Sequence, residues 1–151
     1  MSALPEVEAL IPHRRPQRVI DRLLTWEGPR LIAEGRFSPD DVQGHFPGEP
    51  VVPGVVLIEG LAQALACLGR LNGEQGRALL TSIEGARFRA IAAPPCTLTF
   101  EVEVVEQRFR VTTARGWVRE GERLICTATL SAALLDAAAL PGHARADAAD
   151  S

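Results

Sequence analysis

Hydrophobic and polar residues alternate along much of the second half of the chain. In the segment 97–109 the alternating positions are Leu98, Phe100, Val102 and Val104 on one side and Thr99, Glu101, Glu103 and Val105 on the other. A period of two predicts a β-strand, and the polar side predicts a sheet with one face in water. Apolar-rich segments with β-branched residues predict the other strands, at 18–26, 31–37, 79–91, 111–118 and 122–135.

One long apolar segment departs from this alternation. Residues 55–71 are apolar at most positions, which predicts a helix that is wrapped by other structure. Pro53 suits the first helical position, and Asn72-Gly73 suits the C-terminal end of the helix. One long buried helix together with five to six antiparallel strands predicts an α+β fold.

The chain of 151 residues is long enough for one domain with a core and too short for two. We place this domain at residues 1–135, because the Ala- and Asp-rich segment 136–151 has little to bury and is predicted to be a flexible tail. The formal net charge of −3 argues against a nucleic-acid binder. Since the chain shows neither a secretory leader nor an apolar run of 18 residues without charges, we expect a cytoplasmic protein that does not span a membrane.

Residues that could bind a metal or form disulfides are scattered along the chain. The three cysteines, Cys67, Cys96 and Cys126, are far apart, and we predict that they are small buried apolar side chains in a reducing compartment. The histidines at positions 13, 45 and 143 are too dispersed for a metal set, so no metal site is predicted. Motifs for dinucleotides, for nucleoside triphosphates and for a serine nucleophile are absent.

The segment 44–54 reads Gly-His-Phe-Pro-Gly-Glu-Pro-Val-Val-Pro-Gly. Its three prolines fix φ at their own positions and favour extended conformations before them, so His45 is predicted to be held still. Glu59 follows in the apolar helix, where a buried carboxyl is costly unless it is paired or protonated. A fixed imidazole and a buried carboxyl are the two groups that a proton-transfer reaction needs.

The start of the helix predicts a third functional group. Pro53-Gly54 would present unpaired N–H groups and the positive end of the helix dipole to a ligand carbonyl, and glycine allows a close approach. Taken singly, His45 is more often a structural residue, and Glu59 and Gln63 fit a narrow solvated stripe on an amphipathic helix. The combination is more specific than either part and favours catalysis.

These residues resemble the 3-hydroxyacyl-acyl-carrier-protein dehydratases of the hotdog fold. The family signature is close to Gly-His-Phe-Pro-Gly-x-Pro-x-x-Pro-Gly-Val, followed by a helix with Glu and then Ala-Gln. Segment 11–22, which begins Ile-Pro-His-Arg-Arg-Pro and ends Val-Ile-Asp-Arg, is similar to the family's Leu-Pro-His-Arg-Tyr-Pro and Val-Asp-Arg block. Segment 86–98, with Ala-Arg-Phe-Arg, is similar to its Val-Arg-Phe-Arg block. The resemblance covers roughly residues 10–135.

The resemblance implies a hotdog fold, with a curved antiparallel sheet around the helix, and a homodimer or a trimer of such dimers. It implies sites at the dimer interface, with His45 of one subunit as the base and Glu59 of the other as the acid. The Gly54 N–H would polarise the thioester carbonyl, the Val51 carbonyl would orient the imidazole, and Gln63 would hydrogen-bond the carboxyl. The implied oxyanion and substrate-binding residues are Gly54, Val51, Gln63, Phe46 and Pro53.

The implied activity is elimination of water from 3-hydroxyacyl thioesters on acyl carrier protein, which gives trans-2-enoyl thioesters without a cofactor. Five arginines are either surface charges or a docking patch for the acidic carrier, namely Arg14, Arg15, Arg18, Arg87 and Arg89. Arg15 stands where the family usually has Tyr, and Pro94-Pro95-Cys96 replaces Pro-Gly-Asp. These departures suggest a side branch in polyketide or polyene biosynthesis as the alternative to fatty-acid biosynthesis.

Two other functions stay open at this point. A hotdog acyl thioesterase would hydrolyse the thioester with Glu59 or a bound water, although such relatives generally lack the Gly-His-Phe-Pro-Gly block. A non-catalytic acyl-binding subunit would keep the fold and contribute only one half of a heterodimeric site. The presence of both His45 and Glu59 weighs against that second alternative.

Overall fold

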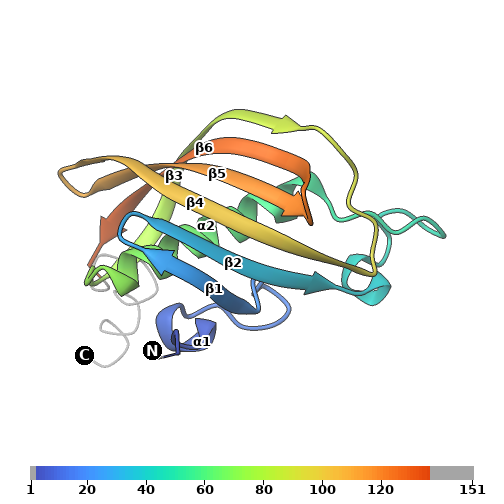
Figure 1. Cartoon of the computed structure of the whole chain (residues 1–151), viewed down its shortest axis with the longest axis horizontal. Coiled ribbons are helices and arrows are strands. Elements are labelled where there is room, and N and C mark those ends of the chain that lie inside the picture. Colours follow the sequence, from blue (N-terminus) through green and yellow to red (C-terminus); the bar gives the residue numbers. More distant parts are fainter. Residues whose placement is uncertain (1–2, 137–151) are drawn as a thin grey trace, which may run out of the picture.

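The computed structural model describes residues 3–136, which form one antiparallel sheet curved around a central helix (Figure 1). The elements are α1 (Val7–Leu10), β1 (Arg22–Glu27), β2 (Arg30–Phe37), the 3-10 helix η1 (Pro39–Val42), α2 (Gly54–Leu71), β3 (Arg77–Phe88), β4 (Cys96–Arg108), β5 (Val111–Glu120) and β6 (Arg123–Leu135). The strand order is β1-β2-β4-β5-β6-β3. The predicted α+β class and its six strands are confirmed, whereas the predicted tail lies outside the described residues apart from Asp136.

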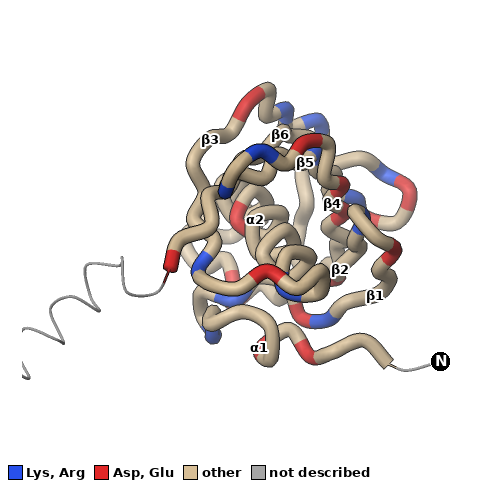
Figure 2. Tube along the Cα trace, turned by 90° about the vertical axis from the view of Figure 1, so that its left-hand side faces the viewer, with Lys and Arg blue, Asp and Glu red and all other residues tan. Residues whose placement is uncertain are grey.

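Helix α2 lies inside the curve of the sheet, with strands on most of its sides (Figure 2). The side chains of Leu57, Leu61, Leu65 and Leu68 are at most 5% exposed. A Cβ atom added at Gly60 would lie 2.2 Å from the Phe100 ring of β4, and one added at Gly116 of β5 would lie 2.8 Å from Leu61. These two glycines therefore let the helix pack directly on the middle of the sheet.

The ends of α2 differ slightly from the prediction. Pro53 has an extended ψ of 142°, so it caps the helix and Gly54 is the first helical residue. Asn72 is the C-cap, and Gly73 has φ of +91°, which confirms the predicted stop. The 18 residues of α2 are long and apolar enough to cross a membrane, but 50% of this stretch is buried inside the fold, as expected of a core helix.

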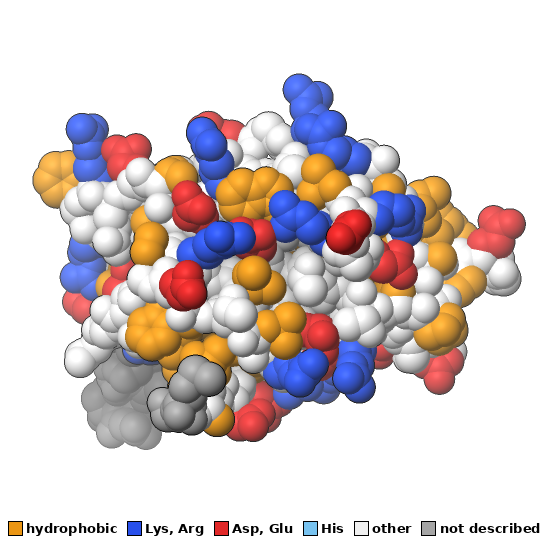
Figure 3. Space-filling model, viewed as in Figure 1, with side chains coloured by type: hydrophobic (Ala, Val, Ile, Leu, Met, Phe, Trp, Pro, Cys, Tyr) orange, Lys and Arg blue, Asp and Glu red, His pale blue; other side chains and the backbone are white. Residues whose placement is uncertain are grey.

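The predicted wet face of the sheet contains one buried charge. Glu101 is only 7% exposed, because Arg30 of β2 and Arg119 of β5 reach its two carboxylate oxygens at 2.5 and 2.7 Å from the neighbouring strands. The alternation along β4 thus predicts the face of Glu101 correctly, but the long arginine side chains cover it. Arginines and acidic residues lie beside one another over this outer face (Figure 3).

The segment before β1 forms a loop, although strand structure was predicted from residue 18. The N–H groups of Gln17 and Arg18 both donate to the Arg14 carbonyl, which makes a turn. The Val19 N–H donates to the Gln63 side chain of α2, at 2.8 Å, and not to a neighbouring strand. The loop therefore crosses α2 at Gln63.

Strand β3 forms an edge of the sheet and pairs only with β6. Its exposed apolar residues include Leu79, Leu80 and Ile83, which are 40%, 42% and 46% exposed. A long edge strand with apolar side chains is a surface that proteins normally cover or pair. The exposed apolar edge of β3 is therefore a surface at which a second protein chain could pair.

Candidate active site

His45 lies in the loop between η1 and α2, and its ring has a fixed partner. Its Nδ1 is 3.0 Å from the Val51 carbonyl oxygen, and the ring stacks on Phe46 with a centroid distance of 4.1 Å. A carbonyl oxygen only accepts hydrogen bonds, so Nδ1 carries the proton of the neutral ring. The other ring nitrogen, Nε2, is then unprotonated and can accept a proton.

The backbone of this loop is tied down at both ends. The Val51 N–H donates to the His45 carbonyl at 2.8 Å, and the Val52 N–H donates to the Ala92 carbonyl at 2.9 Å. Gly44 and Gly48 have φ values of +87° and +76°, which other residues rarely adopt. The loop thus depends on its glycines for its turns as well as on its prolines.

The first turn of α2 presents its N-terminal end beside the loop. The N–H groups of Val56 and Leu57 donate to the Pro53 carbonyl, and no partner is recorded for the Gly54 N–H among residues 3–136. A Cβ atom added at Gly54 would lie 2.8 Å from the Phe88 ring. Gly54 therefore offers an N–H donor, at the positive end of the helix dipole, in a place where a larger residue would displace Phe88.

Glu59 is less buried than the apolar helix predicts. Its side chain is 43% exposed. It lines two cavities, of about 180 and 600 Å³. The smaller is lined by apolar residues that include Leu65, Leu79 and Ala132, and His45 lines neither of the two.

Gln63 holds the Glu59 carboxylate from one turn further along α2. Its amide nitrogen donates to Glu59 Oε1 at 2.9 Å and to the Gln17 carbonyl at 2.8 Å, while its oxygen accepts from the Val19 N–H. The side chain is only 1% exposed. With three hydrogen bonds and almost no exposure, this amide has one fixed orientation.

A second side chain, that of His13, lies near the same carboxylate, and the sequence pattern did not predict this contact. His13 Nε2 lies 3.7 Å from Glu59 Oε1, although His13 was considered only as a metal ligand. The contact joins residues 46 positions apart, so no local spacing could reveal it. The available signal was the place of His13 in the N-terminal block that resembles the family.

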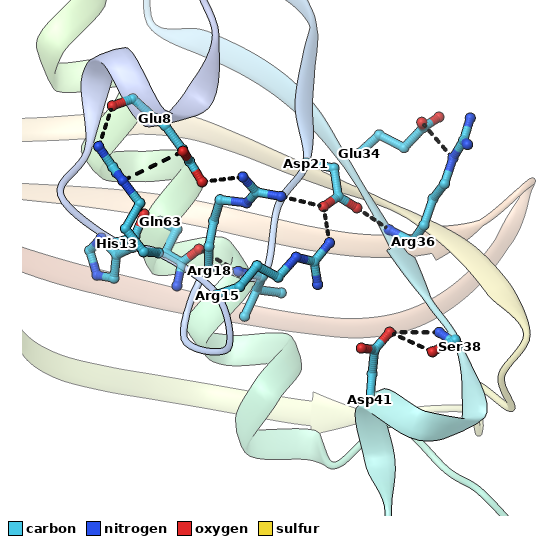
Figure 4. A network of polar contacts seen from close by, with 12 residues as sticks. Glu8, His13, Arg15, Arg18, Asp21, Glu34, Arg36, Ser38, Asp41 and Gln63 are labelled. Carbon is cyan, nitrogen blue, oxygen red and sulfur yellow. Dashed lines mark hydrogen bonds and ion pairs between the residues drawn. The ribbon is translucent and has the colours of Figure 1, made fainter.

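The five arginines of the expected docking patch fall into two groups. Three of them lie in the loop before β1 and make ion pairs within the chain (Figure 4), namely Arg14 with Glu8, Arg15 with Asp21, and Arg18 with both acids. The Arg18 side chain is only 18% exposed. Arg87 and Arg89 are exposed, and no ion pair is recorded for either among residues 3–136.

Burial, which was predicted for all three cysteines, is found for Cys67 and Cys126. Burial raises the pKa of Cys67 to about 12 and that of Cys126 to about 11, so both thiols stay protonated near neutral pH. Cys96 is half-buried, and its pKa is also raised to about 11, mainly by burial. Within residues 3–136 no three His, Cys, Asp or Glu side chains are grouped to hold a metal ion.

Comparison of the sequence with models of known protein families shows the family to which this chain belongs. The model of the FabA-like domain matches residues 11–129, a stretch that contains His45, Gly54 and Glu59. The chain belongs to the FabA-like family. The resemblance of the N-terminal block, the glycine- and proline-rich loop and the helix to this group of dehydratases is thereby confirmed.

Relatives of this FabA-like protein agree over nearly its whole length. It is 40% identical, over 134 residues, to the 3-hydroxyacyl-acyl-carrier-protein dehydratase FabZ of Symbiobacterium thermophilum, covering 85% of this chain and 94% of the relative. It is 36% identical, over 141 residues, to the dehydratase of the same name from Chloroflexus aggregans, covering 90% and 98%.

Solved structures show the same fold. The dehydratase heterocomplex ApeI:P from Xenorhabdus doucetiae gives a TM-score of 0.77 at 15% identity, over 89% of this chain and 94% of that one. A hypothetical thioesterase with coenzyme A from Streptococcus pneumoniae TIGR4 gives 0.63 at 12% identity, over 76% and 85%. At such identities the likeness concerns the fold alone, and the predicted hotdog architecture is confirmed.

Proposed function

We propose that this protein eliminates water from 3-hydroxyacyl thioesters carried on acyl carrier protein and gives trans-2-enoyl thioesters in fatty-acid biosynthesis. The dehydratase names of its FabZ relatives, at 35–40% identity, support this assignment. The structural observation that carries it is the hydrogen bond between His45 Nδ1 and the Val51 carbonyl, which leaves Nε2 as a base.

In the proposed reaction, His45 Nε2 removes a proton from C2 of the substrate. The negative charge that develops on the thioester oxygen is stabilised by the Gly54 N–H at the start of α2. Pro53 and Phe46 flank these two groups and would shape the space around the thioester. A fixed ring and a fixed donor cost no reorganisation during the reaction, which is why a rigid loop suits this step.

Glu59 supplies the second proton in this proposal. Its protonated carboxyl donates to the C3 hydroxyl, the C3–O bond breaks, and water leaves as the C2–C3 double bond forms. Before the next turnover the proton on His45 passes to Glu59, either directly or by release to solvent and uptake of another proton by Glu59. Gln63 holds the carboxyl through Oε1, so the acid does not need to be ordered at the moment of reaction.

We propose that the two groups meet across a homodimer. Glu59 is 43% exposed in the single chain, and His45 lines neither of the two cavities of about 180 and 600 Å³ beside Glu59. The unpaired edge of β3 carries exposed Leu79, Leu80 and Ile83, which a second copy would cover. Pairing of two such edges would bury these side chains and enclose Glu59. A trimer of dimers remains our proposal for any higher assembly.

The acyl chain is proposed to lie along α2. The apolar cavity beside Glu59 shares Leu65, Ala78 and Ala132 with a cavity of about 270 Å³ further along the helix. An acyl chain that entered at Glu59 would therefore follow an apolar path towards the C-terminal end of α2. Such carrier-bound substrates are consistent with a cytoplasmic enzyme, which is the location that we propose.

The assay is incubation of the purified protein with a 3-hydroxyacyl thioester of acyl carrier protein. We expect absorbance of an enoyl thioester to appear without release of free thiol. Thiol release without the enoyl product would instead identify a thioesterase. If the pure protein shows no turnover and a second hotdog subunit restores it, the chain would be the half-site partner.

Arg87 and Arg89 are the arginines that we propose for carrier docking, because they are exposed and unpaired within residues 3–136. The double variant R87E/R89E is expected to raise KM for the carrier-linked substrate by about tenfold, since a reversed charge repels an acidic partner. KM for the same acyl group on pantetheine should not change. Arg108, which is also exposed, provides the control variant R108E, and equal effects of both variants would contradict the docking patch.

A further inference from the structure

His13 differs from an ordinary surface histidine because one ring nitrogen lies near a carboxylate and the other is buried. Its Nε2 faces Glu59 Oε1 at 3.7 Å, and its Nδ1 is buried without a hydrogen-bond partner. The same oxygen, Oε1, accepts the hydrogen bond from Gln63. No partner is recorded for the other oxygen, Oε2, within the described part of the chain. The two neighbouring side chains thus converge on one oxygen of this carboxyl.

The buried Nδ1 decides which tautomer His13 adopts. A proton on Nδ1 would be a buried donor without an acceptor, whereas Nε2 lies on the side of the ring that faces the Glu59 carboxyl, 3.7 Å from Oε1. The neutral ring therefore carries its proton on Nε2, the nitrogen that lies 3.7 Å from Glu59 Oε1. His13 and His45 then have opposite tautomers, because His45 donates from Nδ1 to the Val51 carbonyl.

The position of the ring is set by the backbone around it. The Arg14 guanidinium donates to the carbonyls of Glu8, Ile11 and His13 itself, at 2.9–3.1 Å. The ring forms part of the wall of the cavity that Glu59 lines. In Figure 4, His13 lies beside Gln63 at the end of the ion-pair network of the loop. The loop thus brings both His13 and the partners of Gln63 onto the same side of α2.

We propose that His13 is a positioning residue, which together with Gln63 keeps the acidic proton of Glu59 on Oε2. When the carboxyl is protonated, the hydrogen bond that Gln63 donates to Oε1 and the His13 N–H 3.7 Å from the same atom favour the proton on the other oxygen, because a hydrogen on Oε1 would face both N–H groups. Oε2 is then the atom that donates to the departing hydroxyl. This inference rests on the proposed dehydration, and it assigns a role within that reaction to His13.

The kinetic test compares two variants at this position. His13→Met keeps an uncharged side chain of similar size without a donor, and we expect kcat to fall about tenfold with KM within about twofold. His13→Gln can place its amide N–H near Glu59, and it should keep kcat within about threefold of the wild type. R108M, at an exposed site on β4, is the control for the introduced methionine, and the melting temperature reports on folding.

Wild-type kcat in a folded His13→Met variant would overturn the proposal, and so would equal losses of kcat in His13→Met and His13→Gln. A wild-type protein without dehydratase activity would instead contradict the proposed function. A second test needs no substrate and no variant that might unfold. The ¹⁵N NMR spectrum of histidine-labelled protein should show His13 protonated at Nε2 and His45 at Nδ1, and a His13 ring protonated at Nδ1 would overturn the inference.

Discussion

His45→Ala is expected to lower kcat for 3-hydroxyacyl thioester dehydration by roughly 1,000-fold, since positioned general acid–base groups contribute about 10²–10⁴-fold. The variant removes the ring whose Nδ1 is hydrogen-bonded to the Val51 carbonyl and whose Nε2 is therefore free to accept a proton. KM should change little, because the fold of the loop depends on backbone hydrogen bonds that alanine keeps. Initial rates of enoyl formation with the wild type and the variant measure the effect.

Gln43→Ala is the matched control for this substitution. Gln43 lies two residues earlier in the same loop, and its side chain is exposed. The control should retain the wild-type rate, and both variants should keep the wild-type melting temperature to within a few degrees. A folded His45→Ala protein with more than about a tenth of the wild-type kcat would remove the histidine from the mechanism.

The sequence predicts the parts of this fold that are governed by local rules. Period-two alternation predicts β4, and the apolar run with Asn72-Gly73 at its end predicts α2, because both patterns reflect burial on one element. The loop around His45 is predictable for the same reason, since glycine and proline restrict their own backbone. Family resemblance adds what local rules cannot, namely the roles of the residues in a reaction.

The features that sequence reasoning missed depend on contacts between distant segments. The apolar neighbours of Glu59 in the sequence predict a buried carboxyl, but they do not tell which side of α2 the sheet of one chain covers. Glu101 lies on the face that alternation predicts, and yet Arg30 and Arg119 from other strands bury it. The contact of His13 with Glu59 likewise arises because the loop before β1 crosses the helix.

Glu59→Gln is the second variant for which we expect a large loss, of roughly 100- to 1,000-fold in kcat, because an amide cannot serve as the acid. The amide has nearly the size of the carboxyl, and its oxygen can still accept the hydrogen bond from Gln63. Stability should therefore change by no more than about 0.5 kcal/mol, as for most substitutions at half-exposed positions. The enoyl absorbance assay and the melting temperature measure the two effects.

The two inactive proteins together test whether the site is shared between subunits. If His45 of one protomer works with Glu59 of its partner, a heterodimer of the His45→Ala and Glu59→Gln chains contains one intact site and one doubly altered site. Equal amounts, denatured and refolded together, should assort into half heterodimers and recover about a quarter of the wild-type activity. Each variant refolded alone should stay inactive, which controls for the procedure. If both groups act within one chain, every site in the mixture is damaged, and the absence of recovered activity would contradict the shared site.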